Sequence, residues 1–148
     1  MQARTKKLEP VVQHVDNNEQ KALQAVAYSQ AQLKLQIEIL QKLHDYKQEY
    51  LNGSAGGLGE HSVSALQLQE FHRFLAQLDE TIRQQSGIVD RARHELDVKR
   101  QKWQTHRSKS QAMHKVVDRI VASEQQQQQA REQKIMDEIA LRNLNRRV

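Results

Sequence analysis

The chain has no cysteine, one proline and five glycines in 148 residues, and only 4% of it is aromatic. Without cysteine it has no disulfide, no thiolate nucleophile and no cysteine-type zinc site. The scarcity of aromatic residues argues against a compact globular core. No window approaches the roughly 20 consecutive apolar residues of a membrane span, and the polar segment after the basic start is not an ordinary secretory signal peptide. These absences predict a soluble cytoplasmic protein.

Glutamine, alanine, leucine, lysine and glutamate dominate instead, and all of them favour helix. Between Leu68 and Ile120, sixteen positions at alternating spacings of three and four carry twelve apolar residues. The overall apolar content of 37% predicts about six by chance. Such a stripe predicts one long amphipathic helix that pairs with another. Its members are Leu68, Phe71, Leu75, Leu78, Ile82, Gln85, Val89, Ala92, Leu96, Lys99, Trp103, His106, Ser110, Met113, Val117 and Ile120.

The fold predicted from these patterns is all-α: two long helices in an antiparallel coiled-coil hairpin that forms a single domain. Pro10 is suited to a first helical turn, so the first helix is expected over about 10–51. Residues 52–61 hold four of the five glycines and predict the turn. The second helix is expected over about 62–143, with Ser62 or Ser64 as its cap.

The second helix is expected to be the longer one. With a turn centred near residue 57, residue i faces about residue 113 − i, and everything beyond about residue 105 extends past the first helix. This overhang contains the glutamine-rich run 125–129 and several apolar residues. An apolar edge left without an intrachain partner indicates a binding surface for another protein.

Enzyme and metal chemistry find little support in the sequence. No two of the seven histidines are four residues apart, and a histidine–acid pair at that spacing, such as His114 with Asp118, supplies only two ligands. The glycine-rich turn contains no phosphate-binding motif. A two-helix rod also offers no concave site that excludes water. We therefore expect no enzymatic activity, no metal and no cofactor.

Basic residues are concentrated in the second half of the chain, where nine lie between Arg91 and Arg119. Such a segment attracts nucleic acid, but its charges lie on several helical faces and its only aromatic residue is Trp103. A solvated coiled-coil surface is the favoured interpretation, and we expect no nucleic-acid partner. A basic nucleic-acid-binding rod and a plain structural coiled coil remain alternatives.

A dense apolar cluster follows the turn. Phe71, Leu75, Leu78 and Ile82 follow the stripe, whereas Phe74 begins a second line that reaches Ile88. The first helix can pack closely against only one of these two rows of apolar residues. The cluster is therefore either a wide core near the turn or an exposed docking patch.

Three segments together, 43–50, 68–82 and 132–147, resemble the bacterial flagellar FliJ family in order and spacing. The resemblance covers nearly the whole chain and implies an antiparallel coiled-coil stalk of the flagellar type III export ATPase complex. It implies three kinds of partner: the hexameric export ATPase, the cytoplasmic domain of the membrane export-gate protein, and export chaperones. It also implies a location at the cytoplasmic face of the inner membrane, with a monomeric hairpin when free. The stalk of a related injection-type secretion system is the alternative.

The resemblance also assigns candidate sites. The gate-binding patch falls on Phe71, Leu75, Leu78 and Ile82, with the line through Phe74 and Ile88 facing the first helix instead. The end that inserts into the ATPase ring is expected to use apolar residues of both helices and basic residues near the carboxyl terminus. These are Val11, Val12, Val15, Ile135, Met136, Ile139 and Leu144, with Arg142, Arg146 and Arg147.

Overall fold

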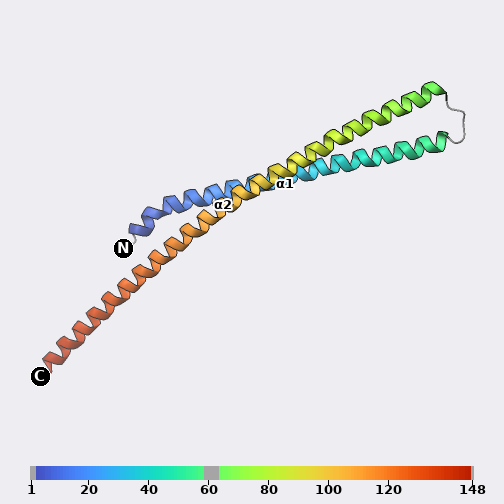
Figure 1. Cartoon of the computed structure of the whole chain (residues 1–148). Coiled ribbons are helices and arrows are strands. Elements are labelled where there is room, and N and C mark those ends of the chain that lie inside the picture. The colour runs from blue at the N-terminus through green and yellow to red at the C-terminus, as the bar shows by residue number, and fades with distance from the viewer. Residues whose placement is uncertain (1–2, 59–63, 148) are drawn as a thin grey trace. The chain divides into compact units, whose positions relative to one another are not determined.

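The computed structural model describes residues 3–58 and 64–147, which form two long helices (Figure 1). Helix α1 spans Ala3–Leu58 and helix α2 spans Ala65–Arg146. No strand occurs in the described residues, and the two helices pack against each other. The chain is therefore an all-α helical hairpin, which confirms the predicted fold class.

Helix α1 is longer at both ends than the expected 10–51. Pro10 lies inside it, and the helix continues through Gly53 to Leu58. Extending an existing helix adds one hydrogen bond for each residue fixed, so a helix extends into glycines that would not nucleate one. Of the expected turn, residues 59–61 lie outside the described residues.

A reciprocal cap begins α2. The Gln67 amide donates to the Ser64 hydroxyl, and the Ser64 amide donates to the Gln67 side-chain oxygen, each at 3.2 Å. This capping box satisfies two amides that the first helical turn leaves without carbonyl partners. Ser64 is thus one of the two predicted capping residues; Ser62 lies outside the described residues.

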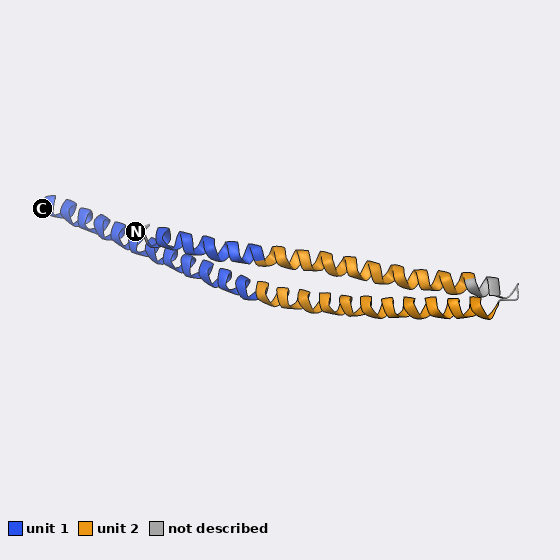
Figure 2. Ribbon diagram, turned by 90° about the horizontal axis from the view of Figure 1, so that it is seen from above, with its two compact units in different colours: residues 1–21, 104–148 blue, residues 22–103 orange. Residues whose placement is uncertain are grey.

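The chain divides into two compact units (Figure 2). Unit 1 consists of residues 1–21 and 104–148, and unit 2 of residues 22–103. In each unit a segment of α1 packs beside a segment of α2.

Unit 2 contains the apolar seam. Among the residues of this unit whose burial is described, the buried apolar ones are Val26, Leu78, Val89 and Leu96. Of the sixteen stripe positions in α2, only Leu68 is exposed, at 44%, and the others are buried or half-buried. The predicted stripe is therefore the face that α2 turns toward α1.

A buried amide interrupts this seam. The side-chain nitrogen of Gln85 donates to the Gln36 backbone carbonyl at 2.9 Å and to the Gln36 side-chain oxygen at 2.8 Å. Gln85 is buried, so these bonds replace water that the amide loses on packing. A polar pair at one layer of a coiled coil favours the register that satisfies it.

Unit 1 has a more polar seam. Among the described residues of unit 1, Ser110 is the only buried one, with 5% of its surface exposed. The apolar residues around it are half-buried: Val12 and Val15 on α1, and Met113, Val117 and Ile120 on α2. Beyond Ile120 every described residue except Glu124 is exposed, so this part of α2 forms the overhang.

The predicted pairing register was wrong. It placed Asp16 opposite residue 97, whereas Asp16 contacts Ser110 and His114. It likewise placed Gln36 opposite residue 77, whereas Gln36 contacts Gln85. The reason is the extension of α1 to Leu58, because each residue added before the turn moves the pairing by two. The overhang consequently begins near residue 121 rather than 105.

Candidate partner-binding surfaces

The four residues predicted to bind the export gate lie along one side of α2 in unit 2. Leu78 is buried, with 7% of its surface exposed, whereas Phe71, Leu75 and Ile82 are half-buried. All four belong to the apolar stripe, so each side chain lies at least partly against α1. Leu78 is therefore a packing residue, and the other three each leave a partly accessible edge for a partner.

An aromatic cluster adjoins this patch. The Tyr50 ring stacks on Phe71 with centroids 5.2 Å apart and lies 4.5 Å from Phe74, while Tyr46 meets Phe74 edge-on at 6.1 Å. The expectation that only the line of Phe74 faces the first helix is therefore wrong. Both phenylalanines contact Tyr50, because its broad ring spans two neighbouring rows of the facing helix.

Tyr46 is a surface residue that the predicted patch did not include. Half of it, 51%, is exposed, although its ring touches Phe74. Next to it, Lys47 forms an ion pair with Asp79 at 2.6 Å. The predicted patch was placed from the apolar spacing of the second helix, which could not indicate Tyr46 because this residue lies on the first helix.

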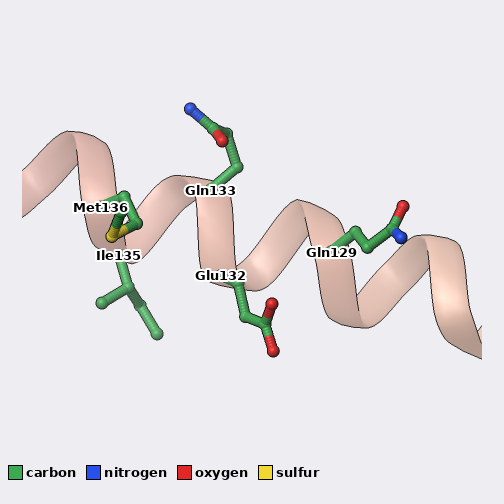
Figure 3. Close-up of a pocket in the computed structure, with 5 residues that line it drawn as sticks. All are labelled: Gln129, Glu132, Gln133, Ile135 and Met136. Atoms are coloured by element: carbon green, nitrogen blue, oxygen red, sulfur yellow. The ribbon is translucent and has the colours of Figure 1, made fainter.

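The second predicted site is the apolar tail of α2 in unit 1. Ile135, Met136, Ile139 and Leu144 are all exposed, as are Arg142, Arg146 and Arg147. The side chains of Gln129, Glu132, Gln133, Ile135 and Met136 border a shallow hollow (Figure 3). Leu141 is a further exposed apolar residue of this tail that the prediction missed.

The α1 residues assigned to the same site are less accessible. Val11 is exposed, but Val12 and Val15 are half-buried. Their spacing of three matches the seam of unit 1, so Val12 and Val15 contribute to packing against α2. Val11 is the apolar residue of this set most available to a partner.

A polar cluster joins the two helices of unit 1. The Ser110 hydroxyl donates to Asp16 Oδ1 at 2.7 Å, and Nε2 of His114 lies 2.9 Å from Oδ1 and 3.1 Å from Oδ2. The hydrogen bond from Ser110, followed by the contact with His114, holds the pKa of the Asp16 carboxyl below its ordinary value of 3.8. Asp16 thus accepts a hydrogen bond from Ser110 and lies within hydrogen-bond distance of the His114 imidazole.

Net charge separates the two units. Unit 1 contains thirteen lysines and arginines against eight acidic residues, whereas unit 2 contains ten of each. The whole excess of +5 therefore belongs to unit 1. The basic segment Arg91–Arg119 does not coincide with this excess, because its first part, up to residue 103, belongs to the neutral unit 2.

The described residues contain no group of three or more histidine and acidic side chains positioned to hold a metal ion. Likewise, neither described helix has a stretch long and apolar enough to cross a membrane.

Comparison with known proteins identifies one family. The family model described as flagellar FliJ protein matches residues 5–148, almost the full length of the chain. No curated protein and no solved structure is significantly similar to it.

Proposed function

Because the chain belongs to the flagellar FliJ family, whose members are coiled-coil proteins of flagellar export, we propose that it is a non-enzymatic stalk and adaptor of the flagellar export apparatus. The observation that carries the proposal is the family match over residues 5–148 of a helical hairpin whose long helix ends in an exposed apolar tail. The proposed location is the cytoplasmic face of the inner membrane.

The first proposed partner is the hexameric export ATPase, which would receive the end formed by unit 1. Three properties support this assignment: the exposed apolar residues beyond Ile120, the net charge of +5, and a helix with no α1 segment beside it. An apolar helix surface loses water when a ring closes around it, and basic residues attract acidic loops. The ring, rather than this chain, would hydrolyse ATP.

The second proposed partner is the cytoplasmic domain of the export-gate protein, bound at the accessible edges of Phe71, Leu75 and Ile82. Half-buried apolar and aromatic residues are suited to such a contact, because their side chains are already fixed by intrachain packing. Tyr46 extends the same surface onto α1. Leu78 would contribute by supporting this surface from within the seam.

Release and recycling of export chaperones is the third proposed role, and it rests on the family resemblance alone. The stalk of a related injection-type secretion system is the competing assignment. Binding assays with the gate domains of both systems distinguish the two, since only the cognate domain should bind.

The gate contact is tested by replacing Leu75 and Ile82 with alanine and measuring binding to the gate domain by calorimetry. We expect at least a tenfold weaker association, about 1.4 kcal/mol, with helix content preserved. Val89→Ala is the matched control, because Val89 is 3% exposed and lies in the same seam. This control should lose stability but keep its affinity. A double variant that binds like the unmodified chain would refute the gate-binding surface.

The ring contact needs a separate variant, so that its failure is distinguishable from failure at the gate. Replacing Ile135 and Ile139 with alanine should weaken co-purification with the ATPase while leaving gate binding unchanged. Replacement of Gln126 and Gln127, which are exposed polar residues of the same tail, is the control. Unchanged ATPase binding by the isoleucine variant would remove the tail from the proposal.

A further inference from the structure

Unit 1 has to hold the first part of α1 on α2 without a buried apolar core. In its described residues only the polar Ser110 is buried, whereas the four apolar residues found buried in the described part of the chain lie in unit 2. Fully burying an aliphatic side chain contributes about 1.5–3 kcal/mol, and half-burial contributes correspondingly less. Polar contacts therefore account for a larger share of helix pairing in unit 1 than in unit 2.

The cluster of Asp16, Ser110 and His114 is a polar contact that joins the two helices there. Ser110 and His114 are four residues apart on α2, so both side chains reach one carboxylate on α1 from adjacent turns. Residues 3–15 precede Asp16, and this junction supplements the half-buried Thr5, Leu8, Val12 and Val15 in attaching them to α2. The strength of the junction sets how often this segment separates from α2.

We propose that Asp16, Ser110 and His114 form a histidine-controlled clasp that holds residues 3–15 on α2 more tightly when His114 is protonated. In the imidazolium form, Nε2 donates a charge-assisted hydrogen bond to the carboxylate. In the neutral form the same nitrogen donates a weaker bond in one tautomer and none in the other. The hydroxyl of Ser110 donates to Asp16 in either state, so the clasp loosens without dissolving.

The direction of the pH dependence follows from these charges. Histidine changes its charge between about pH 5 and 8. Because its pKa lies below the ordinary 3.8, Asp16 stays ionised throughout that range. On α1 the charged group in contact with the imidazole is Asp16, and Glu19 lies one turn further along. On α2 Lys115 is adjacent and Asp118 lies one turn further. We therefore expect the clasp to be strongest at the acidic end of this pH range.

Hydrogen exchange of the full chain, followed by mass spectrometry, tests the clasp. Protection of the amides in residues 3–15 is measured between about pH 5.5 and 8 and divided by the intrinsic rate, which removes the chemical effect of pH. We expect protection to be about two- to fivefold higher at the acidic end, the range that an exposed ion pair supplies. Amides in the unit 2 part of α1 should show no such change.

Matched variants separate the clasp from general effects. His114→Gln should remove the pH dependence, and Asp16→Asn should remove it while also lowering protection at every pH. Ser110→Ala should lower protection but keep the dependence. His14→Gln, at an exposed histidine whose contact is with Asn18 on the same helix, should leave the dependence intact. A dependence that persists in His114→Gln, or is absent from the unmodified chain, would overturn the proposal.

Discussion

Replacement of Gln85 tests whether the buried amide stabilises the hairpin or mainly sets its register. Gln85→Ala removes two hydrogen bonds, at 2.8 and 2.9 Å, to Gln36. At about 0.5–1.5 kcal/mol net for each bond, the expected loss is about 1–3 kcal/mol in the free energy of unfolding. The Gln36 side chain is only half-buried, so in the variant water can replace part of the hydrogen bonding that Gln36 loses. The expected loss of stability therefore lies in the lower half of that range.

Gln85→Leu gives a different result from the alanine variant. It loses the same bonds but buries an aliphatic side chain in the seam, which contributes about 1.5–3 kcal/mol. The two effects nearly cancel, so its unfolding midpoint should lie close to that of the unmodified chain. Adding Gln36→Leu should make the hairpin more stable, because a continuous apolar seam replaces the polar layer.

Urea unfolding followed by helical circular dichroism measures these differences, and light scattering reports whether the all-leucine seam associates. Loss of register specificity predicts dimers or larger species in the double variant, as in coiled coils that lose a buried polar layer. A Gln85→Ala variant within about 0.5 kcal/mol of the unmodified chain, a margin set by the usual scatter of surface substitutions, would refute a stabilising role for the amide.

Two further predictions concern a glycine and acid stability. Gly87→Ala should raise the free energy of unfolding by up to about 1 kcal/mol in urea unfolding, because an added Cβ meets no atom within 4 Å and alanine favours helix; a loss of stability would contradict this reasoning. The pKa values of Asp16 and Glu80 are lowered, chiefly by the hydrogen bonds from Ser110 and Arg83, so their stabilisation is complete above the ordinary values of 3.8 and 4.5. It should be lost as the pH falls through the lowered values, and the variant Asp16→Asn should lose less stability between about pH 5 and 2 than the unmodified chain.

The helix-facing stripe could be predicted from sequence because helical periodicity depends on local spacing alone. Gln85 and Ser110 occupied stripe positions despite being polar, and both are buried in the structure. The helix ends were less predictable. Pro10 lies inside α1, and the helix extends through Gly53, since hydrogen bonding along a long helix outweighs one unfavourable residue.

Contacts between the helices could not be predicted, because each depends on the pairing register. An error of a few residues at the turn placed Asp16 opposite residue 97 and so hid its contact with Ser110 and His114. The exposure of the tail was predictable, since its apolar residues lie beyond any paired segment of α1. The half-buried state of Phe71 in the proposed gate patch was not, because Phe71 stacks on the Tyr50 ring of α1.

Burial and charge together assign different physical roles to the two units. Unit 2 has buried apolar residues and no net charge, so its helix pairing is expected to persist at high salt. Unit 1 has half-buried apolar residues, an exposed tail and all of the net charge, so it repels itself and gains little from its own packing. A partner that covers the tail and neutralises the charge would therefore stabilise unit 1 more than unit 2. Protection of unit 1 amides on adding the export ATPase, with unit 2 unchanged, follows from this asymmetry.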